Sequence, residues 1–257
     1  MLLIRSFVIA FSTYSRIPMP RFKWKKEDMA YSLVFFPWIG AVIGLLLYFW
    51  LGFAKRLELG VPATVLVGTA IPLIITGGFH LDGFMDTMDA VRSFREKEVK
   101  LSIMKDPHVG AFAIISLLLY YILYIAFLSE LKTDRQVMIV AVGFVLSRTL
   151  SGLSLVFFKP ARAEGMLYEE ATNTRKDDVK YWLFLTLLIC AVAMIGFNIL
   201  AGLAAFIAAL LWTLIYKRFC LREFGGITGD TSGYFVTMTE MVVLITVVIC
   251  GFIKLKI

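Results

Sequence analysis

The sequence is poor in charged residues, cysteine and histidine. Only 18% of its 257 residues are Asp, Glu, Lys or Arg, while 60% are hydrophobic; an average soluble domain has about 25% charged and about 45–50% apolar residues. This composition excludes an ordinary soluble globule, and the 22 Phe, 10 Tyr and 5 Trp exclude a disordered chain. The three cysteines form neither a disulfide framework nor a paired metal-ligand spacing. The remaining class is that of polytopic membrane proteins.

Long hydrophobic runs are abundant. A bilayer core about 30 Å thick requires roughly 20 apolar helical residues. Seven stretches approach this length, namely 31–54, 61–79, 111–128, 137–158, 181–198, 199–216 and 234–253. We therefore expect an all-α bundle of about seven transmembrane helices, forming a single integral membrane domain over residues 1–257. One long helix over 181–216 is the competing interpretation, although such a run is too long for a single span.

Lys and Arg are distributed unevenly between the connections. Alternate connections, starting from the amino terminus, carry 19 of them, the other connections carry six, and Arg148 falls inside a span. The positive-inside rule therefore predicts a multi-pass protein of the cytoplasmic membrane with a cytosolic amino terminus and an outer carboxyl terminus. We interpret residues 1–30 as an amphipathic amino-terminal segment that lies on the cytosolic side and is retained, not as a cleaved signal peptide. Every long polar connection falls on the predicted cytosolic side.

The strongest chemical signal is the run GGFHLDGFMDTMDA at residues 77–90. On a helix, Asp82, Asp86 and Asp89 share one face, where like charges repel. A hard divalent cation that bridges to substrate phosphates, most plausibly Mg²⁺, would relieve this repulsion. His80, beside them, is a candidate proton acceptor. The structural alternative is a solvated helix face just outside the membrane, with His80 as an interfacial hydrogen-bonding residue.

A second acidic segment, GGITGDTSG at residues 225–233, precedes the last span. Its glycines allow backbone N–H groups to approach an anion closely, so Gly229 is a candidate substrate contact. Asp230 is a candidate ligand of the same cation, since both segments fall on the predicted cytosolic side. An ordinary glycine-rich turn is the alternative interpretation.

Charged residues elsewhere supply further candidates. Arg148 and Glu240 fall within predicted spans, where an ionisable residue is a functional hypothesis by default; a buried ion pair between two helices is the competing interpretation. Arg95, Lys105 and Asp106 lie in the connection after the acidic run. Basic residues near an acidic metal site suit a polyanionic phosphate substrate, although the positive-inside bias also predicts cytosolic Lys and Arg.

Taken together, these motifs resemble the cobalamin synthase (adenosylcobinamide-GDP ribazoletransferase) family. The resemblance covers nearly the whole chain and follows the family order, with the 80–90 run as its most specific part. Its landmarks are FSTYSRIP at 11–18, FPWIG at 36–40, HLDGFMDTMDA at 80–90, IMKDP at 103–107 with GAF at 110–112, and GGITGD at 225–230. Where the family often has a small residue and, three positions later, an acid, this sequence has Tyr234 and Thr237, so no role for an acid at 237 carries over.

The resemblance implies a Mg²⁺-dependent membrane enzyme. It would join the GDP-activated corrinoid to α-ribazole or its 5′-phosphate, giving adenosylcobalamin or its 5′-phosphate and GMP, the step that completes the nucleotide loop. We expect in-line attack by the ribazole 5′ oxygen on the corrinoid-linked phosphorus. From the residues themselves, we expect His80, Asp82, Lys105 and Asp106 to act in catalysis, Arg95, Arg148, Gly229 and Glu240 to bind substrate, and Asp82, Asp86, Asp89 and Asp230 to bind the metal.

Two other classes compete with the transferase. A polytopic transporter of a phosphorylated or corrinoid solute is suggested by the seven spans and the intramembrane Arg148 and Glu240, but the acids concentrate at one membrane face and no internal repeat is visible. A non-catalytic corrinoid assembly scaffold is the third class. The expected partners are the two substrates and the lipid bilayer, with no nucleic acid. A homo-oligomer, or association with other corrinoid-pathway enzymes, is left open.

Overall fold

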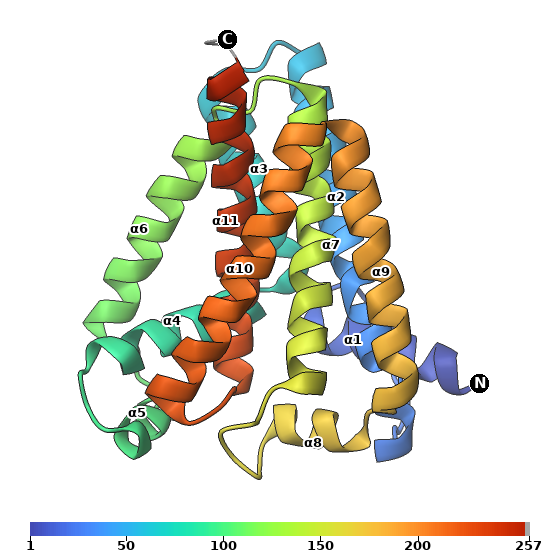
Figure 1. The fold of residues 1–257 in the computed structure, drawn as a ribbon, viewed down its shortest axis with the longest axis vertical. Helices are drawn as coiled ribbons and strands as arrows, with labels where there is room; N and C mark the ends of the chain where they lie inside the picture. The colour runs from blue at the N-terminus through green and yellow to red at the C-terminus, as the bar shows by residue number, and fades with distance from the viewer. Residues whose placement is uncertain (255–257) are drawn as a thin grey trace.

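The computed structural model describes residues 1–254 as helices joined by short connections (Figure 1). The described part contains no β-strand, so the all-α expectation is confirmed. Its elements, in chain order, are α1 (Leu2–Tyr14), the 3-10 helix η1 (Lys26–Met29), α2 (Ser32–Arg56), α3 (Val61–Thr76), α4 (Phe79–Arg92), α5 (Lys97–Ile103), α6 (Ala111–Leu128), α7 (Asp134–Phe157), α8 (Met166–Asn173), α9 (Lys176–Phe197), α10 (Ile199–Phe224) and α11 (Gly229–Lys254).

Six helices are long and apolar enough to cross a membrane, and a seventh crossing results if the bent pair α3 and α4 counts as one. Within residues 1–254, six of the seven predicted spans correspond to these six helices, whereas the predicted span 61–79 falls on α3 and the bend that follows it. The multi-pass class is confirmed. Residues 181–216 form two helices, because the chain breaks at Asn198, whose side chain caps α10 by accepting from the N–H of Ala201. The single long helix considered above is therefore wrong.

Helix ends differ from the hydrophobic boundaries where polar residues cap or extend a helix. α10 continues to Phe224, beyond the apolar run that ends near 216, and its added turns carry Lys217, Arg218 and Arg222. α11 begins at Gly229, five residues before the predicted start at 234. The polar ends of these two helices thus extend the bundle beyond its apolar band.

The long polar connections gather at one end of the bundle (Figure 1). α1, α5, α8 and the α10–α11 connection lie at the lower end in this view, whereas the α2–α3, α6–α7 and α9–α10 connections and the end of α11 lie at the upper end. This is the alternation that the distribution of Lys and Arg predicts. The final tail residues 255–257 lie outside the described part, so the prediction for the carboxyl terminus rests on the end of α11.

α7 is the central helix of the bundle. It packs against α2, α9 and α11, and most residues of its apolar stretch are buried. In α6, α9 and α10, less than a third of the residues in the apolar stretch are buried. The remaining faces of these outer helices carry exposed residues such as Leu118, Leu188 and Leu211. Such apolar faces suit contact with lipid chains, since a helix satisfies its own backbone hydrogen bonds.

The amino-terminal lead-in is folded against the bundle. One face of α1 is buried, and the guanidinium of Arg5 pairs with Asp28 at 2.9 Å. Tyr14 donates a hydrogen bond to the buried carboxylate of Glu170 in α8, which also accepts from Ser32 at 2.9 Å. These contacts hold α1 beside α2 and α8 at the lower end of the bundle.

Candidate active site

A sharp bend places α4 across the end of the bundle. α3 ends at Thr76, α4 begins at Phe79, and their axes differ by 94°. Gly77 and Gly78 join them with φ angles of 63° and 82°, conformations that residues with side chains rarely adopt. α4 thus leaves the direction of a membrane span and lies crosswise, nearer the end that holds α5 and α8 (Figure 1).

Three carboxylates share one face of α4, as the spacing predicts. Asp82 is exposed, while Asp86 and Asp89 are half-buried. Burial, followed by the negative charges of Asp82, Asp230 and Asp89, raises the pKa of Asp86 from 3.8 to about 7. The other three aspartates singled out in the sequence therefore lie within electrostatic reach of Asp86.

α11 crosses α4 at two glycines. A Cβ atom at Gly83 would lie 2.7 Å from the main-chain oxygen of Asp230, and one at Gly233 would lie 2.7 Å from that of His80. No side chain fits at either position without moving a helix. The close crossing brings Asp230, in the first turn of α11, to the carboxylate face of α4.

The connection before α11 is held in place by a neighbouring loop. The N–H of Ile227 donates to the carbonyl of Lys159 at 2.9 Å, and the N–H of Ala161 donates to the carbonyl of Ile227 at 2.8 Å. Thr228 and Thr231 cap the helix reciprocally, since each side chain accepts from the backbone N–H of the other, at 3.1 and 2.8 Å. These contacts fix the direction in which Asp230 leaves the backbone.

The four carboxylates have the donor chemistry that a hard divalent cation requires. Among the residues that the structure describes, no three His, Cys, Asp or Glu side chains form a ready-made metal site. Mg²⁺ usually binds through one or two carboxylates and takes its other ligands from water and substrate phosphates. The carboxylate of Asp89 packs closely against Gly110 at the start of α6, whereas Asp82 is exposed.

His80 lies apart from the carboxylate face. Its side chain is buried, stacks on Phe36 with ring centroids 5.5 Å apart, and lines the same cavity as Arg148 and Glu240. Neither ring nitrogen has a hydrogen-bond partner in the described structure. Because residues two apart on a helix face different directions, His80 and Asp82 do not converge on one reacting atom.

Arg148 and Glu240 pair with each other. Arg148 in α7 donates to Glu240 in α11 at 2.7 Å, and their side chains are 1% and 8% exposed. Arg148 also donates to the carbonyl of Phe144 and to the hydroxyl of Ser147. The structure thus forms the interhelical ion pair that the sequence offered as the alternative to substrate binding.

The remaining candidates lie at the same end but on its outer surface. Lys105 pairs with Glu164 at 2.7 Å, and Asp106 contacts His108 at 2.7 Å; all four side chains are exposed. Arg95 is exposed after the end of α4. Gly229 is exposed at the first position of α11 with open space around it.

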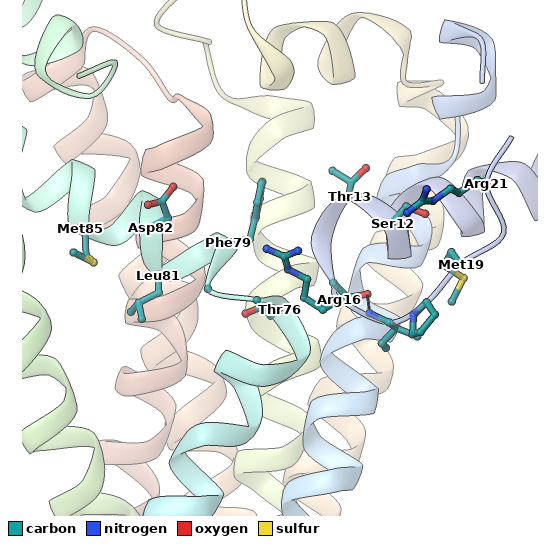
Figure 2. Close-up of a pocket in the computed structure, with 15 residues that line it drawn as sticks. Ser12, Thr13, Arg16, Met19, Arg21, Thr76, Phe79, Leu81, Asp82 and Met85 are labelled. Atoms are coloured by element: carbon teal, nitrogen blue, oxygen red, sulfur yellow. Dashed lines mark hydrogen bonds between the residues drawn. The ribbon is translucent and has the colours of Figure 1, made fainter. Parts of the chain in front are cut away.

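Two basic features were missed by the sequence reasoning. Arg162 donates to the carbonyl of Leu101, and its charge acts on Asp230. Arg16 and Arg21, from the segment after α1, line an open cavity of about 940 Å³ that reaches Asp82 (Figure 2). The sequence alone does not distinguish these arginines from other basic residues of the connections, because their proximity to the aspartates depends on contacts between distant segments.

These observations define the class: a polytopic helical membrane protein whose carboxylates and arginines gather at one end of the bundle, an arrangement suited to phosphate chemistry. The chain belongs to the cobalamin-5-phosphate synthase family, whose model matches residues 6–248.

Similar curated proteins come from several bacteria. A protein of Lachnoclostridium phytofermentans is 40% identical over 248 residues, covering 96% of this chain and 94% of the relative. One from Desulfitobacterium hafniense is 34% identical over 254 residues, covering 94% and 96%. One from Clostridium perfringens is 30% identical over 234 residues, covering 89% and 91%. All three are named adenosylcobinamide-GDP ribazoletransferase, and no solved structure matches the chain.

Proposed function

We propose that this membrane enzyme transfers the corrinoid-phosphate group of adenosylcobinamide-GDP to α-ribazole or its 5′-phosphate, releasing GMP and giving adenosylcobalamin or its 5′-phosphate. The observation that carries the proposal is the family match over residues 6–248, together with relatives that are all named for this transfer. The transporter alternative finds no support in these names. The polar groups also gather at one end of the bundle, whereas transporter sites lie near the membrane midplane.

The chemistry requires a hydroxyl of the acceptor to attack the corrinoid-linked phosphorus while the bond to GMP breaks. We assign Asp82, Asp86, Asp89 and Asp230 to Mg²⁺, which when bound would neutralise charge on the two phosphates. The proton of the attacking hydroxyl passes to a carboxylate that the cation leaves free. An acceptor that already carries a 5′-phosphate has its 5′ oxygen esterified, so another ribose hydroxyl must then attack, in place of the 5′ oxygen expected above.

The basic residues near the carboxylates support this assignment. Arg162 lies close enough to act on Asp230 electrostatically, so it would counter the charge of a phosphate placed beside that residue. We further propose that this end of the bundle faces the cytosol, where nucleotide substrates occur. The excess of Lys and Arg in the connections at this end supports that orientation.

A product assay with purified protein tests the proposal. Full-length protein in detergent, given adenosylcobinamide-GDP and α-ribazole or its 5′-phosphate, should form the corrinoid product and GMP in equal amounts, and chelation of Mg²⁺ should stop both. Asp82→Asn, Asp86→Asn and Asp230→Asn should each reduce turnover by about 100-fold or more, because misplaced reacting groups cost rates of that order. Glu27→Gln, an exposed acid outside this cluster, is the matched control. Absence of product from folded wild-type protein would reject the function.

A further inference from the structure

The cavity beside the α3–α4 bend is lined by two segments that are far apart in the sequence, and no role has been assigned to it so far. One wall is the segment from Ser12 to Arg21, which includes most of the motif at 11–18; the other is the bend and the first turns of α4. Its volume, about 940 Å³, is near the upper end of the range for small-molecule sites. Figure 2 shows Arg16 and Arg21 on the α1 side and Asp82 on the α4 side.

Arg16 is held in position by the bend itself. Its backbone N–H donates to the carbonyl of Ile75, near the end of α3, at 2.7 Å. Its side chain lies so closely over Gly77 that a Cβ atom there would collide with it. The same glycine that turns the chain thus provides the surface on which the arginine rests.

The two arginines carry charge that the described protein leaves uncompensated. Within residues 1–254, neither Arg16 nor Arg21 forms an ion pair or a side-chain hydrogen bond. Some other exposed cations at this end form ion pairs, as Lys105 does with Glu164. Asp82 is the only carboxylate that lines the cavity, and it belongs to the carboxylate cluster.

We propose that this cavity binds the acceptor and that Arg16 and Arg21 bind its 5′-phosphate, an inference that rests on the proposed function. A phosphate monoester carries about 1.5–2 negative charges at neutral pH, which two guanidinium groups match. The donor's pyrophosphate belongs at the carboxylate cluster with the cation. Phe79, Met19 and Met85 also line the cavity and offer apolar surface to a flat aromatic base. Asp82 lines the cavity as well, so a ribose hydroxyl bound near Asp82 would lie close to the reacting phosphorus.

The test compares two acceptors that differ only in the phosphate. For Arg16→Gln and Arg21→Gln in detergent-purified full-length protein, kcat/KM with α-ribazole 5′-phosphate should fall by about 10- to 100-fold, the effect of losing one charge-assisted hydrogen bond. The value with α-ribazole and the KM for adenosylcobinamide-GDP should stay within about twofold of wild type. Arg56 is an exposed arginine at the opposite end of the bundle. Arg56→Gln should therefore leave kcat/KM with either acceptor and the KM for adenosylcobinamide-GDP unchanged.

Equal losses with both acceptors, or a raised donor KM, would overturn the assignment and place the arginines on the donor. A second readout needs no turnover. Without donor or Mg²⁺, α-ribazole 5′-phosphate should raise the Tm of wild type more than α-ribazole does, and Arg16→Gln should abolish the difference. A difference that persists in both variants would also overturn the proposal.

A lipid headgroup carries a phosphate too, so the kinetics should be repeated in nanodiscs of phosphatidylcholine with and without phosphatidylglycerol. Acceptor preference that is independent of the anionic lipid supports the proposal, whereas preference that follows the lipid would overturn it. The two hypotheses fail differently: wild-type protein without product rejects the proposed function, and active wild-type protein whose variants keep the acceptor preference rejects only this inference.

Discussion

Gly83→Ala is the most direct test of the crossing between α4 and α11. The added methyl group would lie 2.7 Å from the main-chain oxygen of Asp230 and 2.8 Å from its Cα. That is about 0.7 Å closer than the start of ordinary van der Waals contact, and both neighbours are backbone atoms, which cannot rotate away. The two helices must therefore separate where the carboxylates meet.

The expected result is a larger loss of rate than of stability. Overpacking of this kind costs roughly 1–3 kcal/mol of folding free energy, which lowers Tm but leaves the protein folded. A displacement approaching 1 Å between Asp230 and the face of Asp82 and Asp86 should reduce kcat by about 100-fold. The apparent affinity for Mg²⁺ should weaken in parallel, because its ligands come from both helices.

Gly52→Ala is the matched control, since an added Cβ there meets nothing within 4 Å. It replaces glycine within a helix by a better helix former, so Tm should stay constant or rise. Both variants should be measured for Tm, kcat and Mg²⁺ titration in the same detergent. The reasoning is refuted if Gly83→Ala keeps wild-type kcat, or if its activity falls only in proportion to the unfolded fraction.

The other predictions concern pH, the buried ion pair and sidedness. Folding raises the pKa of Asp86 from 3.8 to about 7, so between these values the folded protein keeps a proton that the unfolded chain has lost. Mg²⁺-free protein should therefore lose Tm as the pH rises from about 4 to about 7 and level off above that, and Asp86→Asn should flatten this change. Protons should also compete with Mg²⁺ below pH 7, so a Mg²⁺ half-saturation that does not vary with pH would contradict the assignment. Arg148→Ala or Glu240→Ala should each cost about 3–5 kcal/mol of stability, and Arg148→Met with Glu240→Leu should recover most of it; a raised donor KM at unchanged Tm would instead indicate substrate binding. Reporter fusions after residues 95 and 132 should score inside and outside, and the reverse result would move the site to the outer face.

The spans could be predicted from sequence because composition alone determines them. A run of apolar residues long enough to cross a bilayer has few other stable environments, and the distribution of Lys and Arg orders the connections. The acidic stripe on α4 follows from helical periodicity in the same way. Helix ends were less accurate, since those of α10 and α11 depend on polar turns and threonine caps beyond the apolar runs.

The missing parts of the site depend on contacts between distant segments. Gly77–Gly78 indicates a break, but which way α4 turns is decided by its packing on α11 at Gly83. In the sequence, Arg16 and Arg162 do not differ from the other cations of the predicted cytosolic connections; only the fold places Arg16 in a cavity with Asp82 and Arg162 near Asp230. The two-residue offset between His80 and Asp82 already indicates that their side chains face different directions on α4.

The hydrogen bond from Tyr14 to Glu170 has a consequence for biosynthesis. Its partners are 156 residues apart, so at about 5–20 residues per second the ribosome needs roughly 8–30 s to deliver α8 after α1 has emerged. Until then the first helix has no partner for its tyrosine, and the wall that it contributes beside α4 is not fixed. Asp230 emerges later still. The ribosome must therefore synthesise the chain at least as far as the first turn of α11 before the wall beside α4 and the four aspartates can come together.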